Sequence, residues 1–343
     1  MATSTRLSRR CGRPDSKSDW PLKRPDSPSL RDTLRGVGEQ LAGAGIESPG
    51  VEAERLLAHV LGVDRSRLAL EADAPLPAGA ARELARLVAR RAAGQPLQHL
   101  EGTVAFRDLV LRADARALIP RPETEQLVDL IARELRIQSA GSAVRTMVRP
   151  DAGSPSDSST ASARDDREPV AVALDIGTGS GAIALSLVAE GLARRVVALD
   201  VSEAALAQAS ENRELAGIEA ERVELRHSGP DPFAALRLGE QFDLLVSNPP
   251  YVRDSEIEHL PMEVRDHEPR AALAGGSDGL DVVRRIAARG GEALRPGGRL
   301  FLEIGADQGQ AASALFEAAG GWEAVQCRPD LSGRDRFLVA RRR

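Results

Sequence analysis

The segment from Val170 to Asp200 constrains the fold more strongly than any other part of this chain. An apolar run that ends in an acid, 170–175, leads into the sequence D-I-G-T-G-S-G, which opens a helical pattern. A second apolar run, 195–199, ends in Asp200, 19 residues after Gly181. This strand–helix–strand pattern is typical of a nucleotide-binding unit, in which glycines let the ligand approach the backbone and the acid accepts ribose hydroxyls. Because such units build parallel sheets, we expect an α/β fold with a doubly wound sheet.

The spacing of the glycines separates the possible nucleotide sites. A dinucleotide site requires G-x-G-x-x-G, whereas the glycines here stand at every second position. A Walker loop is excluded because no Gly-Lys-Ser/Thr follows, and the chain has only two lysines, Lys17 and Lys23. The pattern resembles motif I of the Rossmann-like S-adenosylmethionine methyltransferases. The resemblance implies that Asp200 binds the ribose of this cofactor and that Asp175 shapes the loop. The loop residues that would carry its methionine and sugar parts are Gly177, Thr178, Gly179, Ser180 and Gly181.

A second motif, Asn248-Pro249-Pro250-Tyr251, follows the apolar run 242–247, which reads as a buried strand. Each proline fixes its own backbone angle and restricts the residue before it. The asparagine side chain and the backbone carbonyls therefore form a stiff, acceptor-rich clamp for a planar NH2 group, with the tyrosine as a flat wall beside it. Such a clamp suits chemistry on an amide or on an exocyclic amine. A Pro-Pro turn also ends many ordinary strands, so the motif gains weight from the glycine loop upstream.

The segment 118–128, with the sequence L-I-P-R-P-E-T-E-Q-L-V, narrows the assignment further. Read physically, it is a proline-stiffened entry into a helix, with Thr124 as a cap and Glu125 in the first turn. The motifs I-P-R-P-E-T-E, D-I-G-T-G-S-G-A-I-A-L and S-N-P-P-Y-V, in this order, closely resemble the HemK/PrmC family. These are protein-(glutamine-N5) methyltransferases that modify peptide chain release factors. Relatives that methylate a ribosomal-protein glutamine typically carry Pro-Arg-Ser-Pro upstream, so the residues at 121–124 favour the release-factor branch.

The resemblance also implies roles for individual residues. The Asn248 side-chain oxygen and the Pro249 carbonyl would accept the two hydrogens of a glutamine amide, aiming the nitrogen lone pair at the methyl group of S-adenosylmethionine. Tyr251 would pack on the amide plane, Pro250 completes the substrate-binding set, and Asn248 also borders the cofactor. Asp231 is expected to meet the adenine amino group, because the usual Asp-Trp-Phe segment here reads S-G-P-D-P-F. The expected partner is a release factor that presents its Gly-Gly-Gln loop.

Alternatives remain open at this point. The same clamp serves adenine-N6 and guanine-N2 methyltransferases that act on nucleic acids, and a ribosomal-protein glutamine is a further possible substrate. The net charge of −5 and the pI of about 5.7 argue against a large nucleic-acid footprint, so no stable nucleic-acid partner is expected. The polar residues of the family segments either line the substrate cleft or pair within the fold: Glu123, Glu268 and Arg336. The scattered histidines have no metal-ligand spacing, so no metal is expected: His99, His227 and His267.

The composition along the chain predicts five regions. They are a disordered extension at 1–28, a helical substrate-binding domain at 29–94, a hairpin linker and lead-in helix at 95–136, a low-complexity insertion at 137–168, and the methyltransferase domain at 169–343. Strands are expected at 170–175, 195–200, 223–227, 242–247, 299–304 and 336–341, with a weaker one at 322–327. No apolar stretch approaches the roughly 20 residues of a membrane span, and the chain has only two cysteines, so we expect a cytoplasmic enzyme.

Overall fold

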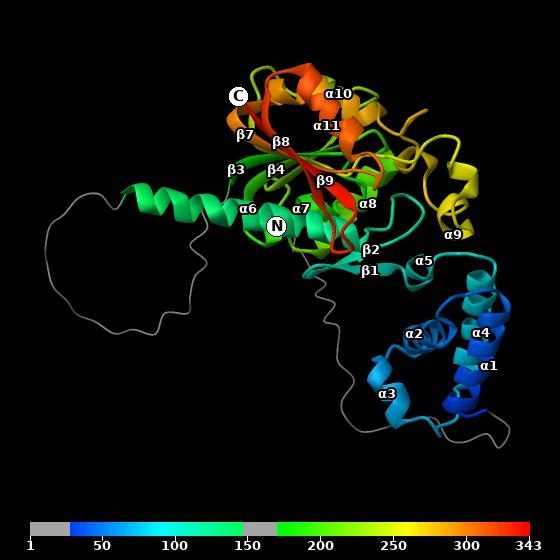
Figure 1. The fold of residues 1–343 in the computed structure, drawn as a ribbon. Helices are drawn as coiled ribbons and strands as arrows, with labels where there is room; N and C mark the ends of the chain where they lie inside the picture. The colour runs from blue at the N-terminus through cyan, green and yellow to red at the C-terminus, as the bar shows by residue number, and fades with distance from the viewer. Residues whose placement is uncertain (1–27, 147–169) are drawn as a thin grey trace, which may run out of the picture. The chain divides into compact units, whose positions relative to one another are not determined.

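The computed structural model describes residues 28–146 and 170–343, with side chains described up to residue 135 and again from residue 170. The chain divides into two compact units, Met1–Ala92 and Ala93–Arg343, which we describe separately. The helices of the first unit and several strands of the second are labelled in Figure 1. The extension expected at 1–28 lies almost entirely outside the described residues, as do residues 147–168 of the expected insertion.

The first unit is helical in its described part. Its elements are α1 (Leu30–Gly43), α2 (Pro49–Leu61), α3 (Arg65–Leu70) and α4 (Ala78–Ala92). Ser29 caps α1, because its hydroxyl accepts a hydrogen bond from the Asp32 backbone N–H at 3.1 Å. Pro49 stands at the first position of α2, where its missing N–H costs nothing. Leucines on the inner faces of these helices form a small core, including the buried Leu41 and Leu57.

A seven-stranded sheet organises the second unit, in the order β5-β4-β3-β6-β7-β9-β8. The strands are β3 (Val170–Ile176), β4 (Ala193–Asp200), β5 (Val223–His227), β6 (Phe242–Ser247), β7 (Leu294–Glu303), β8 (Trp322–Pro329) and β9 (Asp335–Arg342). Strands β3 to β7 pair in parallel, and β9 pairs antiparallel with both β7 and β8. The predicted doubly wound α/β sheet and its seven strands are confirmed, although β7 begins earlier than the expected residue 299.

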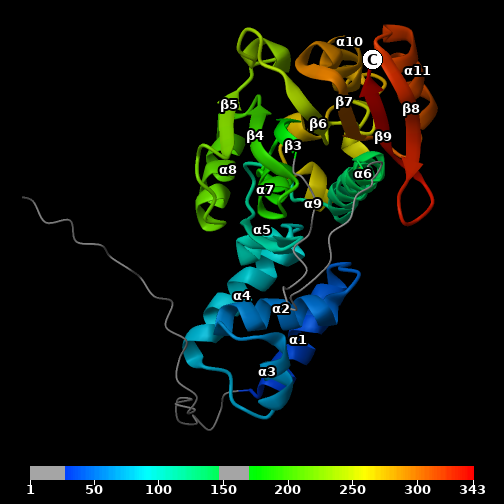
Figure 2. The ribbon, with the colours of Figure 1, turned by 90° about the vertical axis from the view of Figure 1, so that its left-hand side faces the viewer.

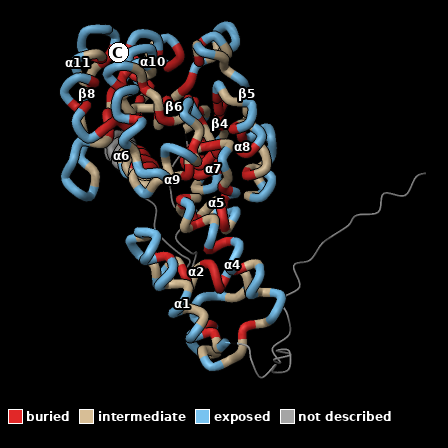
Figure 3. Tube along the Cα trace, turned by 90° about the vertical axis from the view of Figure 1, so that its right-hand side faces the viewer, coloured by how far each residue is buried: buried red, intermediate tan, exposed pale blue. Residues whose placement is uncertain are grey.

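Helices cover both faces of this sheet. They are α6 (Pro122–Thr146), α7 (Ala182–Ala189), α8 (Glu203–Leu215), α10 (Asp281–Ala293) and α11 (Gly309–Ala319). Alternate residues of each central strand enter different cores: Ala173 packs with α6 and α7, whereas its neighbour Leu174 packs with α10 and α11. These four helices are labelled around the sheet in Figure 2. Buried residues accordingly concentrate in the central strands and along α7 (Figure 3). Because helices cover both faces of the sheet, the side chains on both faces of its central strands are buried, which explains why their sequences are continuously apolar.

Shorter elements precede and interrupt the sheet. They are α5 (Leu97–Glu101), the hairpin strands β1 (Thr103–Phe106) and β2 (Leu109–Arg112), and α9 (Met262–Arg265). The hairpin and α6, predicted as a linker and a lead-in helix, belong to the same compact unit as the sheet. The helix α6 continues to Thr146, so the first part of the insertion expected at 137–168 is helical rather than low-complexity loop.

The order of the strands places a ligand crevice. The chain steps outward from β3 to β4 and β5, then returns to the other side of β3 with β6. Ser247, the last residue of β6, donates a buried hydrogen bond to the Ile176 carbonyl at the end of β3, at 2.6 Å. The carboxyl ends of these neighbours therefore lie side by side at the point where the strand order reverses, which is where open α/β sheets bind ligands.

Candidate functional site

A cavity of about 430 Å³ opens at this edge of the sheet, within the second unit. Its volume falls in the roughly 300–1,000 Å³ range of small-molecule sites. Most of the residues predicted to bind cofactor or substrate line it: Gly177, Thr178, Gly179, Ser180, Asp200, Asn248, Pro249 and Pro250. Segments 116–120 and 269–274 supply further walls. One cavity thus joins the glycine loop, the acid of the second strand and the Asn-Pro-Pro motif.

Backbone geometry explains the alternation of glycines in the loop after β3. Gly177, Gly179 and Gly181 all have positive φ, at 74°, 56° and 84°, a region that side chains with a Cβ rarely adopt. Between them, Thr178 donates its hydroxyl hydrogen to the buried Asp175 carboxylate at 2.7 Å. Burial raises the pKa of Asp175 to about 7, against the lowering effect of that hydrogen bond. Asp175 lies beneath the loop rather than in the cavity lining, as expected of a residue that shapes the loop.

Asp200 joins the loop to the second strand end. Its Oδ2 accepts a hydrogen bond from the Gly179 backbone N–H, and its Oδ1 accepts one from Ser202 N–H, each at 2.8 Å. Burial raises the pKa of this carboxyl, and the backbone donors oppose that rise. Each carboxylate oxygen can accept a second hydrogen bond, so Asp200 can bind two ligand hydroxyls while it stays anchored. That donor and acceptor pattern fits the ribose of S-adenosylmethionine.

Three residues of the predicted site lie elsewhere. Gly181 does not border the cavity; a Cβ there would lie 3.3 Å from Ala209 Cβ, so this glycine permits close packing of α8. Tyr251 is half-buried behind the lining, and burial, followed by the nearby Glu303, raises its pKa to about 12. Asp231 is turned away as well: it accepts from the Phe233 N–H and pairs with Arg289 at 2.5 Å. The expected adenine contact of Asp231 is therefore not supported by its position.

The Asn248 side chain is held by a chain of buried polar groups. Its Nδ2 donates to Thr124 Oγ1 at 3.0 Å, and Thr124 donates to Glu303 Oε2 at 2.8 Å. Thr124 was expected to cap a helix, but α6 begins at Pro122, and the Thr124 hydroxyl points to Glu303 instead. Among the described residues, none donates a hydrogen bond to Asn248 Oδ1 or to the Pro249 carbonyl. Both acceptors remain available at the cavity.

The backbone of the motif is supported from behind. Gln308 Nε2 donates to the Tyr251 carbonyl at 3.0 Å, and Gln308 Oε1 accepts from Gly305 N–H at 2.8 Å. A Cβ on Gly279 would lie 2.4 Å from the Tyr251 carbonyl oxygen, so only glycine allows the chain to pass this close. The Asn-Pro-Pro-Tyr backbone is therefore packed against a neighbouring loop as well as stiffened by its prolines.

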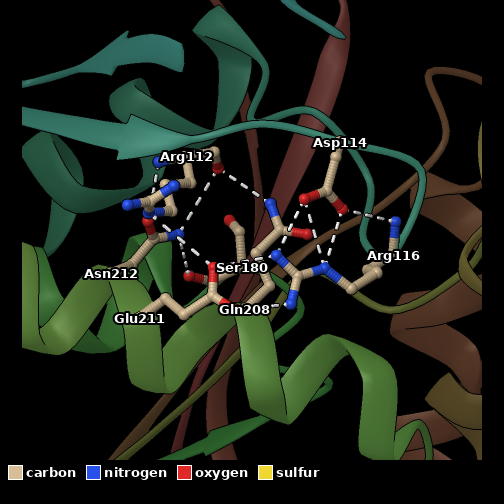
Figure 4. A network of polar contacts seen from close by, with 7 residues as sticks. All are labelled: Arg112, Asp114, Arg116, Ser180, Gln208, Glu211 and Asn212. Carbon is tan, nitrogen blue, oxygen red and sulfur yellow. Dashed lines mark hydrogen bonds and ion pairs between the residues drawn. The ribbon is translucent and has the colours of Figure 1, made fainter. Parts of the chain in front are cut away.

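Polar side chains of α8 tie the hairpin to the glycine loop (Figure 4). Asn212, fully buried, accepts from the Arg112 backbone N–H at 2.6 Å and donates to the Ser180 carbonyl at 2.9 Å. Gln208 donates to the Arg112 carbonyl at 2.8 Å. Arg116, on the cavity wall, pairs with Glu211 of α8 at 2.8 Å. The segment after β2 is thus fixed to the same helix that supports the cofactor loop.

The other polar residues of the family segments pair within the fold. Arg121 forms an ion pair of 2.7 Å with Glu268, whose pKa is raised by burial. Arg336 donates to the Ile304 carbonyl at 3.2 Å. None of these three residues lines the cavity. The arginines that do line it, Arg116 and Arg285, carried no signal in the sequence because arginine is abundant along the whole chain.

No group of three or more His, Cys, Asp or Glu side chains in the part of the chain that the structure describes is arranged to hold a metal ion. No described helix combines the length and the apolar character needed to cross a membrane.

Comparison with known proteins links this site to one family. The PrmC N-terminal domain model matches residues 32–102, and the methyltransferase small domain model matches residues 161–263. A release factor glutamine methyltransferase of Cereibacter sphaeroides is 42% identical over 90% of this chain and 97% of its own length. Proteins of the same name from Moorella thermoacetica and Deinococcus radiodurans are 40% and 39% identical, over 92% and 91% of this chain and 99% and 98% of their own.

Solved structures share less with the chain. A methyltransferase from Pyrococcus furiosus is 18% identical, with a TM-score of 0.44, over 76% of this chain and 98% of its own length.

Proposed function

The chain belongs to the release factor glutamine methyltransferase family, and from this premise we propose that it methylates a release factor. The methyl group of S-adenosylmethionine would go to the side-chain amide nitrogen of the glutamine in the Gly-Gly-Gln motif. The observation that carries the proposal is the pair of unengaged acceptors at the cavity, Asn248 Oδ1 and the Pro249 carbonyl. Two acceptors on one rigid turn match the two hydrogens of a primary amide.

S-adenosylmethionine supplies an electrophilic methyl group on a sulfonium. Its ribose fits Asp200, whose oxygens each keep an acceptor site, and its methionine part fits the exposed backbone of Gly177 and Gly179. Asn248 lines the same cavity, so the substrate amide and the methyl group would meet beside it. These residues bind and orient the two reactants.

The clamp addresses the weak nucleophilicity of an amide. The nitrogen lone pair of a free amide is delocalised into the carbonyl. Hydrogen bonds from both N–H groups to Asn248 and Pro249 favour a geometry in which this lone pair points at the methyl group. Positive charge that develops on the nitrogen is then met by two fixed acceptors. As the new N–C bond forms, the bond between the methyl carbon and sulfur would break and leave a neutral thioether. The amide proton, acidic only at that stage, would pass to water, so the chain needs no strong base at this point. Tyr251, behind the turn, supports the clamp from its half-buried position.

The substrate must bring a glutamine into a cavity that is walled on several sides. A glycine-flanked loop allows the close backbone approach that this requires. We propose that the helical unit, 29–94, provides a second contact for the body of the release factor. A substrate that acts in translation also accounts for a cytoplasmic enzyme.

One assay tests this function. The purified chain is incubated with labelled S-adenosylmethionine and an intact release factor, the same factor with its Gly-Gly-Gln glutamine replaced, a ribosomal protein extract, and bulk RNA and DNA. We expect label only on the unaltered factor. Labelling of the glutamine-replaced factor at an equal rate would refute the proposal that this glutamine is the methylated residue. Preferential labelling of RNA, DNA or a ribosomal protein refutes the release-factor assignment in favour of that substrate.

A further inference from the structure

The orientation of the Asn248 amide decides whether the clamp can work. Its side chain carries an oxygen on one side and an NH2 group on the other, and the two are nearly equal in shape. With Oδ1 at the substrate, the clamp accepts a hydrogen bond; with the amide turned over, it would present donors to the donor groups of the substrate. The difference between the two orientations therefore matters directly to the proposed reaction, on which this inference rests.

Thr124 and Glu303 determine that orientation. A threonine hydroxyl has one hydrogen to donate, and in this structure it goes to Glu303 Oε2 at 2.8 Å. The Thr124 oxygen can then only accept a hydrogen bond from Asn248. The NH2 group of Asn248 is the donor, and its Nδ2 lies 3.0 Å from Thr124 Oγ1. The asparagine oxygen is left facing away from Thr124, without a donor among the described residues.

Burial makes this chain of hydrogen bonds selective. Glu303 has no exposed surface, so water does not offer its carboxylate an alternative donor, and Thr124, only 4% exposed, stands between it and the cavity that Thr124 borders. Glu303 is the last residue of β7, Thr124 lies in the first turn of α6, and Asn248 follows β6. The three residues thus come from three elements that the sheet packs together, and a turned amide would place two acceptors, Thr124 Oγ1 and Asn248 Oδ1, against each other.

We propose that Thr124 and Glu303 are positioning residues that hold the Asn248 amide with its oxygen toward the substrate. Neither needs to touch the reacting atoms for this. Their effect on the reaction passes through Asn248 alone, and that property separates them from residues that merely stabilise the fold.

The test is a double-mutant cycle on single-turnover methyl transfer with labelled cofactor. Thr124→Val keeps the shape of the side chain and removes the hydroxyl; we expect about a tenfold slower transfer, the value of roughly one neutral hydrogen bond. In an Asn248→Ala background the same substitution should cause no further loss, because the group it orients is gone. Thr124→Ser, which restores a hydroxyl, should return the rate close to that of the unaltered chain.

A matched control and a substrate-free readout complete the experiment. Thr103→Val makes the same substitution at an exposed position of β1, outside the cavity lining, and should leave the transfer rate unchanged. Equal losses from Thr124→Val in both backgrounds, or failure of Thr124→Ser to restore the rate, would overturn the inference.

A neutron structure of the unaltered chain shows the orientation of the Asn248 amide directly, even if no release factor is methylated. Deuterium on the Asn248 atom that faces Thr124 supports the inference, and the reverse orientation refutes it. An inactive unaltered chain would refute the proposed function alone.

Discussion

The replacement Glu303→Gln should make the chain more stable at neutral and alkaline pH, but much less so in acid. Burial raises the pKa of Glu303 to about 7 from an ordinary value of 4.5; the Thr124 hydrogen bond and Arg336 only partly oppose it, and Glu123 adds to it. The folded chain therefore holds this proton more tightly than the unfolded chain. The stability associated with the protonated carboxyl is complete below about pH 4.5 and is lost as the pH rises toward 7. The side chain of the Glu303→Gln variant does not ionise, and its amide oxygen can still accept the hydrogen bond from the Thr124 hydroxyl.

The size of the effect follows from the shift. At 1.36 kcal/mol per pKa unit, the variant should gain roughly 2 to 3 kcal/mol over the unaltered chain between pH 5 and pH 8. Urea unfolding at both pH values, followed through the fluorescence of the buried Trp322 in a Trp20→Phe background, reports on the unit that contains Glu303. Glu317→Gln, at an exposed position of α11, is the control and should show no such gain. A stability difference that is the same at pH 5 and pH 8 would mean that Glu303 ionises without penalty, and the reasoning from its burial would fail.

Three further predictions concern the reaction. Asn248→Ala should lower kcat at least about a hundredfold, roughly 3 kcal/mol for one fixed acceptor, with the Kd for S-adenosylmethionine almost unchanged; near-normal turnover would remove Asn248 from the mechanism. Asp200→Ala should raise the cofactor Kd in calorimetry, because the ribose loses a charged acceptor and the loop loses the bond to Gly179; an unchanged Kd would place the ribose elsewhere. Reversing the exposed charges Arg35 and Glu39 of α1 should raise KM for the intact release factor and leave turnover of a Gly-Gly-Gln peptide alone, whereas equal effects on both substrates would argue against a docking role for the helical unit.

The sheet was predictable because its strands are continuous apolar runs that end in glycine, acid or proline. Those signals are local: Val170 to Ile176 reads as a buried strand without knowledge of its neighbours. The antiparallel pairing of β9 between β7 and β8 is a long-range property that no local sequence pattern indicates. The start of β7 was placed too late because Arg295, Pro296 and two glycines interrupt its apolar pattern.

The residues of the cavity were predictable only in part, because the sequence shows the type of each side chain but not the direction in which it points. Thr124 has the sequence context of a helix cap, and nothing local shows that its hydroxyl meets Glu303, 179 residues further along the chain. Asp231 has the right place in sequence for an adenine contact, but in the structure its carboxylate pairs with Arg289 of α10, a contact that the sequence does not reveal. Asn212 and Gln208 sit in an ordinary helix pattern, and their partners at Arg112 become visible only in three dimensions.

The hydrogen bonds of Asn212 define the smallest part of this enzyme that could be expressed alone with its cofactor loop intact. Its amide holds the cofactor loop through Ser180 and the end of the hairpin through Arg112, from a position without solvent. A fragment that started at Val170 would keep every residue of the glycine loop, but it would lose the Arg112 backbone that Asn212 binds and would also lack Thr124. The smallest portable catalytic module therefore begins before the hairpin, upstream of both the glycine loop and the Asn-Pro-Pro-Tyr motif.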